Sequence, residues 1–416
     1  MPRIEAPGPG SRLERPAPAA RLRILIEFLV VGICTLAFAL NAAGIGATLL
    51  TDNFAGQRDF VSYWASGHQL VQRADPYDAP AILDLEHSAG FGANLPPLIM
   101  RNPPPSLLLV LPLGLLGVRG ASLVWSLLMV ASLWISVRMV AAMHTRQGSP
   151  LNLLAYSFAP ALSCLIAGQM GLFVLLGLVL FLRLHRTRPF LAGASLWFCA
   201  LKPHLFLPFG VVLLLWIVFS RRYTIMLGAA AAFAFSTAVA MTFDPHVFAH
   251  YTQMMQSAQL DTKFIPCVST MLRLYLNPNA VWIQFVPAAL GCLWATIWFL
   301  RHRDWDWVEH GSLLVLVSVV VAPYSWFMDQ AVLLPAILHG LYRNRSRNLV
   351  ALLAILSAIV EIANFRGVPL GNRILYPWTA PVWLAWYLLA TRTSASTAEI
   401  VTQTMPAEVT RIAEDV

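Results

Sequence analysis

The stretch from residue 56 to residue 78 combines carboxylates and aromatic rings in a way that suits carbohydrate chemistry. It reads GQRDFVSYWASGHQLVQRADPYD and contains Asp59, Tyr63, Trp64, Asp75, Tyr77 and Asp78. Carboxylates accept hydrogen bonds from sugar hydroxyls, and aromatic faces can stack on the C–H faces of sugar rings. A carboxylate can also act as the general base that takes a proton from an attacking hydroxyl.

The same residues have a purely structural interpretation. Between Phe54 and Leu70, aromatic and apolar residues recur at three- and four-residue spacing, which is typical of an amphipathic helix lying at a membrane interface. Asp59 stands at the start of this predicted helix, where it could cap the helix or pair with Arg58. An ionisable group beside hydrocarbon is also a candidate for function. Both interpretations of Asp59 are kept open at this point.

The composition of the whole chain fixes the environment of this stretch. Of 416 residues, 58% are hydrophobic and only 12% are charged, and the mean hydropathy is +0.66. These are too few polar side chains to cover a soluble globule, so the sequence predicts a membrane protein. Its first apolar run, residues 24–50, exceeds the about 20 residues that a transmembrane helix needs. We expect a retained first helix rather than a cleaved signal peptide.

Charge and cysteine patterns exclude two other classes of protein. The net charge of +8 comes from basic residues in short loops between apolar runs. That placement sets orientation in a membrane, so we reject a nucleic-acid partner. The five cysteines show no CxxC or Cys/His spacing, which argues against a zinc site or a disulfide framework.

Basic turns predict which side of the membrane each loop faces. Those expected in the cytoplasm are residues 12–23, 183–188, 221–222, 301–303 and 343–347. The stretch 56–78 is then extracytoplasmic. Four apolar runs between residues 106 and 184 would place Arg183 outside, so one of them must not cross. We assign residues 151–167, interrupted by Pro160, as re-entrant, although this leaves His144 and Arg146 outside.

These assignments predict an all-α integral membrane protein with about twelve transmembrane helices and both ends in the cytoplasm. The expected divisions are a disordered tail over 1–23, a polytopic domain over 24–391 with large extracytoplasmic loops at 51–105 and 243–280, and a disordered tail over 392–416. The first large loop is expected to contain amphipathic helices. The outer face should therefore carry the chemistry, because the cytoplasmic loops are short and basic.

An ordered set of short motifs resembles glycosyltransferase family 87. The motifs are D-F-x-x-Y-W-x-x-G at 59–67, D-P-Y-D at 75–78, a proline-rich stretch at 102–105, A-G-Q at 167–169 and L-K-P-H at 201–204. The resemblance extends from about Asp59 to Gln330 and implies a membrane enzyme of the GT-C fold. It also implies a polyprenyl-phosphate sugar donor, with mannose as the family's best precedent, and an extracytoplasmic active site. The family's catalytic aspartate, early in the first outer loop, matches Asp59.

Such a donor requires few groups from the protein. An acceptor hydroxyl that attacks the anomeric carbon in line inverts its configuration and needs a base, the role given to Asp59. The leaving group is already a phosphate, so it needs positive charge rather than a general acid. Lys202 is favoured for this role, although it could equally be an interfacial lysine extended toward the headgroups. We group His204, Gln169, Tyr63 and Trp64 with Lys202 as candidates for donor phosphate or sugar binding.

Two of these positions keep structural alternatives. Gln169 could orient a sugar hydroxyl or satisfy the backbone of a broken helix. Relatives tend to carry a histidine shortly after the Ser-Trp of the late outer turn, where this chain has Asp329 nearby. Asp329 could replace that histidine as a hydrogen-bonding partner of sugar or acceptor, or it could cap the next helix.

The remaining acidic residues of the first loop do not predict a metal. Asp75 and Asp78 could be imagined as ligands, but Pro76 between them favours a simple local turn. A lipid monophosphate also carries less charge to neutralise than a nucleotide diphosphate. We expect no metal and no cofactor apart from the donor, and we assign Asp75, Tyr77 and Asp78 to acceptor binding or structure.

The competing function is a transporter or flippase of a lipid-linked sugar. It predicts charged residues inside the spans, and apart from Glu27, Arg138 and Glu361 the apolar runs hold almost none. No internal repeat is visible either. The expected partners are therefore membrane lipids, a polyprenyl-phosphate-linked sugar and a lipid or glycan acceptor. The expected location is a bacterial cytoplasmic membrane, with the active site facing the periplasm or the cell exterior.

Overall fold

The computed structural model describes residues 58–257, 264–302, 304–344, 346–369 and 371–404, and also residues 30, 32, 36, 39 and 56. Within these residues every regular element is a helix and none is a strand, which confirms the all-α prediction over the described part. Most of the predicted first helix (24–50), the tail 1–23 and residues 405–416 lie outside it.

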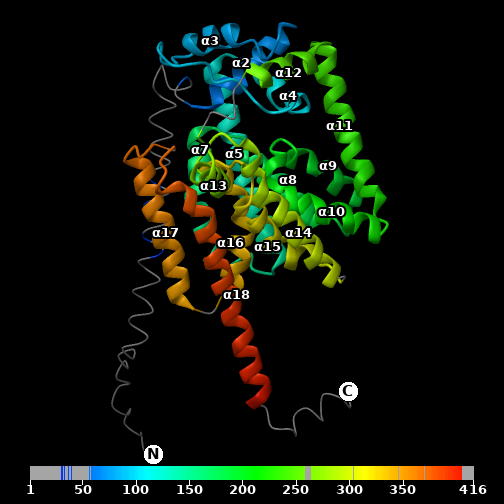
Figure 1. Ribbon diagram of the computed structural model, residues 1–416, viewed down its shortest axis with the longest axis vertical. Coiled ribbons are helices and arrows are strands. Elements are labelled where there is room, and N and C mark those ends of the chain that lie inside the picture. Colours follow the sequence, from blue (N-terminus) through cyan, green and yellow to red (C-terminus); the bar gives the residue numbers. More distant parts are fainter. Residues whose placement is uncertain are drawn as a thin grey trace, which may run out of the picture.

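Short helices form a cap at one end of the molecule, at the top of Figure 1. The cap contains α2 (Phe60–Val71), α3 (Ala79–Ser88), η2 (Pro104–Ser106), α4 (Leu107–Val110), η3 (Leu111–Leu115) and α12 (Val247–Ser257). All of these helices except α12 belong to the first predicted outer loop or to the apolar run that follows it.

Below the cap, the other described helices, long and short, pack into a body. They are α5 (Val118–Met143), α6 (Asn152–Tyr156), α7 (Ala159–Ala167), α8 (Gly171–Leu184), α9 (Pro189–Cys199), η4 (Pro203–Phe206), α10 (Leu207–Phe219), α11 (Tyr223–Phe243), α13 (Val268–Leu276), η5 (Val281–Phe285), α14 (Val286–Arg301), α15 (Trp307–Val320), η6 (Phe327–Leu333), α16 (Leu334–Arg343), α17 (Arg347–Phe365), η7 (Tyr376–Trp378) and α18 (Thr379–Thr404). Since α18 continues to Thr404, a helix extends past residue 392, where the sequence predicts that a tail begins.

Four stretches of the described chain are long and apolar enough to cross a membrane. They are Val118–Met143, Tyr223–Phe243, Val281–Arg301 and Arg347–Asn364. Other apolar helices have only 10–17 residues, so the predicted number of about twelve spans is not confirmed. Proline at the first turn of α7, α9, α10 and α16 contributes to this shortness, because proline can begin a helix but cannot continue the preceding one.

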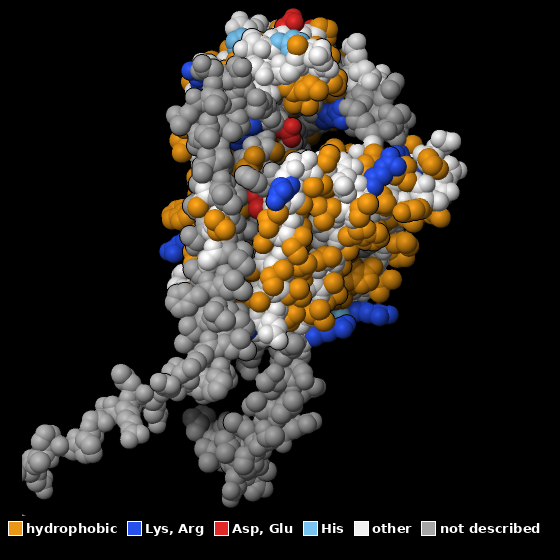
Figure 2. Space-filling model, turned by 90° about the vertical axis from the view of Figure 1, so that its left-hand side faces the viewer, with side chains coloured by type: hydrophobic (Ala, Val, Ile, Leu, Met, Phe, Trp, Pro, Cys, Tyr) orange, Lys and Arg blue, Asp and Glu red, His pale blue; other side chains and the backbone are white. Residues whose placement is uncertain are grey.

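The surface of the body is that of a membrane protein. Large exposed hydrophobic side chains lie on α5, α10, α11, α14 and α17. Figure 2 shows hydrophobic side chains over the part of the body that is not grey, with Lys and Arg side chains both at its lower edge, opposite the cap, and at its upper edge. This distribution fits apolar contact with lipid around the body and basic groups near the two membrane surfaces.

The helix at the start of the first loop does not lie on a surface. Residues 60–67 of α2 are all buried, so the predicted interfacial helix is enclosed by the cap instead. Gly67 allows this close packing. A Cβ atom on Gly67 would lie 2.3 Å from the carbonyl oxygen of Val110, and one on Gly114 would lie 2.2 Å from that of Gly67. The pair of glycines brings α2 and η3 into backbone contact.

The sequence predicts that residues 151–167 re-enter the membrane, whereas the helices of this segment lead from one end of the body to the other. In the structure the ring of His144 stacks on His339, with centroids 5.1 Å apart, and Arg146 lines the same pocket as Arg343. The hydroxyl of Tyr342 also donates to Asn152. The beginning of α6 therefore lies at the Arg343 end of the body, and the end of α7 leads to the cap end. His144 and Arg146 thus lie on the same side as Arg343, as the distribution of basic residues requires.

The segment that does not traverse the body is the preceding apolar run. Residues 104–115 stay beside α2, and the indole of Trp64 donates to the carbonyl oxygen of Leu116 at 3.0 Å. Pro104, Pro105 and Pro112 break this run into η2, α4 and η3, which leaves no helix long enough to cross.

Candidate functional site

The carboxylate of Asp59 is bound by a side chain from the body rather than by its own helix. Asp59 precedes α2, but its side chain makes no capping hydrogen bond. Its Oδ2 instead accepts from Nε2 of Gln169 at 2.6 Å. Within the described part of the chain, no hydrogen bond reaches Oδ1 of Asp59. One oxygen is thus positioned by the protein, and the other can accept a proton from a substrate.

The amide of Gln169 connects this carboxylate to two further side chains. Its Oε1 accepts from the hydroxyl of Tyr63 at 2.8 Å and from Nζ of Lys202 at 3.1 Å. Because Oε1 faces two donors, Nε2 must face the carboxylate of Asp59. The side-chain amide of Gln169 therefore serves the cluster of side chains, and not the backbone of a broken helix.

Lys202 forms a buried ion pair with Asp329. Nζ lies 2.5 Å from Oδ1 of Asp329, and the two residues are 8% and 2% exposed. The other oxygen of Asp329, Oδ2, accepts from the backbone N–H of Trp326 at 2.9 Å. One oxygen of Asp329 thus caps η6, as one of the two sequence alternatives predicts, and the other pairs with Lys202. Its contact with sugar or acceptor stays a prediction.

Asp59, Tyr63, Gln169, Lys202 and Asp329, called here the polar cluster, come from four separate segments. Gly168 ends α7 in the left-handed conformation, with φ of +72°, and so turns Gln169 toward α2. Arg58 fixes the same turn, because its guanidinium donates to the carbonyl oxygens of Leu165 and Ile166 at 2.7 Å each. These two bonds hold the end of α7 beside the start of α2.

Burial is the main influence on the ionisation of Asp59. It raises the pKa of the Asp59 carboxyl, while the hydrogen bond from Gln169 and the charge of Lys202 oppose this rise. Asp329 adds a second negative charge that raises the pKa further. A carboxylate with a raised pKa is a stronger base than an exposed aspartate, and that suits removal of a proton from a hydroxyl.

Two predicted binding residues lie beside the polar cluster rather than in it. Trp64 is buried and donates to Leu116, so its ring serves the packing of the cap. The imidazole of His204 stacks on Tyr324, with centroids 3.9 Å apart. Sequence reasoning missed Tyr324, although it belongs to the same outer turn as Asp329.

The acidic D-P-Y-D stretch lies in another part of the cap. Asp75 accepts from the backbone N–H of Tyr77 at 2.8 Å, the local turn that the sequence predicts. The ring of Tyr77 packs on Tyr251 of α12, and its hydroxyl donates to Asn102. Asp78 is exposed before α3 and makes no side-chain capping bond.

Asn102 is a residue whose position the sequence left unexplained. Its Nδ2 donates to the carbonyl oxygen of Leu201 at 2.7 Å, directly before Lys202. The proline-rich stretch of the motif set thereby holds the turn that carries Lys202. Figure 2 shows a hollow between the cap and the body, with acidic and basic side chains at its rim, and the polar cluster joins these two parts of the fold.

One comparison with known proteins gives a match. The sequence model of glycosyltransferase family 87 matches residues 101–360, which include Gln169, Lys202 and Asp329. No curated protein and no solved structure matches the chain.

Proposed function

Because the chain belongs to glycosyltransferase family 87 and is a membrane glycosyltransferase, we propose that the polar cluster is its transfer site, with Asp59 as general base. The observation that carries this proposal is the hydrogen bond from Gln169 to Asp59. It holds a half-buried carboxylate away from its own helix and leaves Oδ1 without a partner in the described part of the chain.

The proposed reaction is a single displacement. The acceptor hydroxyl gives its proton to Oδ1 of Asp59 as its oxygen bonds to the anomeric carbon. The bond from that carbon to the phosphate oxygen breaks, and the electron pair leaves with the phosphate. Attack from the opposite face inverts the anomeric configuration, through a transition state with oxocarbenium character.

Lys202 is the proposed contact for the leaving phosphate. Its ammonium has three N–H bonds, and Gln169 and Asp329 accept two of them. The third can meet a phosphate oxygen, and positive charge held in a buried site stabilises the developing negative charge. This arrangement needs no general acid, and we propose that the transfer itself needs no metal.

The donor is proposed to be a polyprenyl-phosphate hexose, with mannose as the family's precedent, and the acceptor a membrane lipid or glycan. A lipid-linked donor suits a site between a polar cap and an apolar body, since its chain can stay in the bilayer while its headgroup reaches the polar cluster. We place the site on the extracytoplasmic side of a bacterial cytoplasmic membrane, within a GT-C-type bundle. The alternative, a transporter or flippase, has no support from the family.

A donor comparison tests this proposal. The purified full chain in vesicles of total bacterial lipid is given radiolabelled polyprenyl-phosphate mannose or, separately, GDP-mannose. We expect label to move into a new lipid or glycan product only from the polyprenyl donor. Transfer from GDP-mannose alone would refute the lipid donor. Movement of the labelled donor between leaflets without a new glycosidic bond would favour the flippase.

A further inference from the structure

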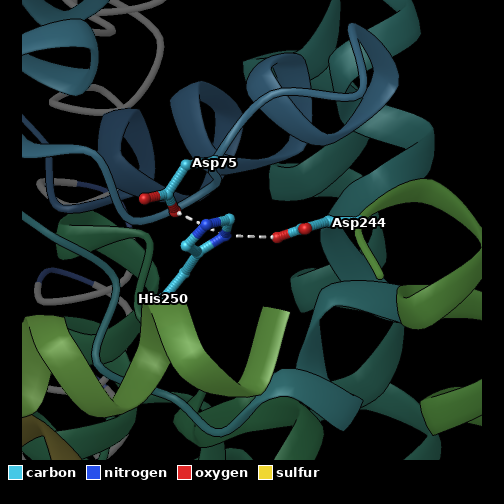
Figure 3. Close-up of side chains that lie close together, drawn as sticks. All are labelled: Asp75, Asp244 and His250. Carbon is cyan, nitrogen blue, oxygen red and sulfur yellow. Dashed lines mark hydrogen bonds and ion pairs between the residues drawn. The ribbon is translucent and has the colours of Figure 1, made fainter. Parts of the chain in front are cut away.

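Three side chains from two predicted outer loops converge in the cap, apart from the polar cluster. They are Asp75 after α2, Asp244 at the end of α11 and His250 on α12 (Figure 3). Nδ1 of His250 lies 2.7 Å from Oδ2 of Asp244 and 3.6 Å from Oδ1 of Asp75. One nitrogen and two carboxylate oxygens from this set all lie within 4.8 Å of one another.

The backbone fixes both carboxylates in place. Oδ1 of Asp244 accepts from the N–H of His246 at 2.9 Å, and Oδ1 of Asp75 accepts from that of Tyr77. The side chain of Asp244 is 6% exposed, whereas those of Asp75 and His250 are 30% and 28% exposed. The set is thus closed on the Asp244 side and open to solvent on the other, so a small ion could enter.

A hydrogen bond between His250 and Asp244 explains only part of this geometry. An imidazole N–H at Nδ1 satisfies Asp244, but the distance of 3.6 Å to Asp75 exceeds that of a hydrogen bond. The second carboxylate therefore adds negative charge beside the first, and its hydrogen bond from the N–H of Tyr77 does not neutralise that charge. A cation held among the three atoms would remove this repulsion.

We propose that Asp75, Asp244 and His250 bind a divalent transition-metal cation, with Zn²⁺ as the preferred ion. An imidazole with two carboxylates suits Zn²⁺, whereas Mg²⁺ and Ca²⁺ favour oxygen ligands alone. Three protein ligands leave a coordination position for water. The sequence considered only Asp75 and Asp78 as possible ligands, and it could not show that Asp244 and His250 come from a distant loop to meet Asp75.

The cation would tie together the parts of the cap that lie over Lys202. Tyr251, next to His250, packs on Tyr77 with ring centroids 5.5 Å apart. Tyr77 donates to Asn102, which in turn donates to Leu201 beside Lys202. The effect of the metal is therefore structural, and it does not depend on whether the polar cluster transfers sugar.

Metal binding to the purified full chain in detergent tests this proposal. After treatment with EDTA, Zn²⁺, Mn²⁺ or Mg²⁺ is added, and the unfolding temperature and the bound metal per chain are measured. We expect Zn²⁺ to raise the unfolding temperature and to bind at one equivalent, with a weaker effect of Mn²⁺ and almost none of Mg²⁺.

Matched variants distinguish this site from binding elsewhere. His250→Gln and Asp75→Asn should each weaken Zn²⁺ binding by at least about 10-fold, as loss of even an outer partner does. His87→Gln and Asp78→Asn, which change exposed residues of the same cap, should keep it. Equal Zn²⁺ binding in all four variants would overturn the site. The site would also be overturned if the wild-type chain binds no metal and His250→Gln still lowers its unfolding temperature. That result would show that His250 and Asp244 form only a histidine–aspartate pair. If His250→Gln fails to fold, Asp75→Asn gives the same decision.

Discussion

At the scale of single residues, Gln169 decides how Asp59 is presented to a substrate. Tyr63 and Lys202 occupy its carbonyl oxygen, so its N–H bond is directed at Oδ2 of Asp59. The hydrogen bond stabilises the charged form of the base, and burial opposes that form. The balance between these two effects sets the pH at which Asp59 can accept a proton.

Gln169→Glu should therefore change the pH dependence of transfer. It places a second carboxylate at hydrogen-bonding distance from Asp59, and two such groups share a proton, which raises the apparent pKa of the pair. Each unit by which the apparent pKa exceeds the assay pH lowers the fraction of free base by about 10-fold. We expect a loss of about 10- to 100-fold at pH 7 that partly recovers at higher pH, measured as a pH–rate profile.

Tyr63→Phe provides the control for this variant. It removes one hydrogen bond to Gln169 but leaves the hydrogen bond between Gln169 and Asp59. Transfer should therefore fall by less than about 10-fold, and its pH profile should stay the same. A Gln169→Glu variant that keeps the wild-type pH profile would show that Gln169 does not act on the base.

The pair formed by Lys202 and Asp329 allows stability to be separated from donor binding. Lys202→Met leaves Asp329 charged, buried and unpaired, which should cost about 3–5 kcal/mol of unfolding free energy. The double variant Lys202→Met/Asp329→Asn removes both charges and should regain most of that stability, as measured by thermal unfolding. Transfer should stay low in both variants, because neither has a cation for the phosphate. Restored transfer in the double variant would remove Lys202 from the donor site.

The sequence predicted the members of the polar cluster better than their contacts. Asp59, Gln169 and Lys202 were candidates because their motifs occur in a recognisable order, but spacing along the chain cannot show that one amide joins them. Trp64 shares a motif with Tyr63, yet one side chain packs against Leu116 and the other bonds Gln169. Successive positions on a helix face different directions, and only the packing of α2 decides which one faces the site.

At the scale of elements, hydropathy could not decide which apolar run crosses the body. Residues 104–115 and residues 151–167 are both short and contain proline. What separates them is tertiary contact: Gly67 and Gly114 hold the first run against α2, and Tyr342 holds the start of the second. The positive-inside rule, applied to Arg146, favours the arrangement seen in the structure.

The cap should lose stability as the pH rises, because of Glu86 on α3. Burial raises the pKa of Glu86 to about 7, although a hydrogen bond from the N–H of Leu98 acts to lower this pKa. Between pH 4.5 and about 7 the unfolded chain ionises first, so stability falls as the pH increases and the loss is complete above pH 7. Glu86→Gln should remove this slope and unfold at a higher temperature than wild type at pH 8.

Thermal unfolding of both proteins at pH 5 and pH 8 checks this expectation. Asp84→Asn, at an exposed position of the same helix, should keep the wild-type slope. If Glu86→Gln retains the full pH dependence, the ionisation of Glu86 does not control the stability of the cap.

At the scale of the whole molecule, the structure determines which turns lie at the same end of the body. Gln147 and Asn344 belong to the turns at one end of the body, since Arg146 and Arg343 line one pocket, and Ala79 lies in the cap at the other end. We expect a cysteine at position 79 to react with an impermeant maleimide in intact cells. Cysteines at 147 and 344 should react only after permeabilisation.

Labelling at 147 but not at 344 in intact cells would show that these two residues lie on opposite sides of the membrane. It would support the re-entrant assignment of residues 151–167. Labelling at 147 and 344 but not at 79 would reverse the orientation and move the polar cluster to the cytoplasmic face. Cys164, Cys199 and Cys267 are buried and should give little background.

Asp59→Asn is the direct test of whether Asp59 accepts the proton of the attacking hydroxyl. The amide keeps the shape of the side chain but cannot take a proton, so transfer from the polyprenyl donor should fall by about 10²- to 10⁴-fold. The unfolding temperature of the same preparation should stay near that of wild type, because the side-chain oxygen of Asn can accept the hydrogen bond from Gln169 that Asp59 accepts. A folded Asp59→Asn protein with wild-type transfer would rule out Asp59 as the general base.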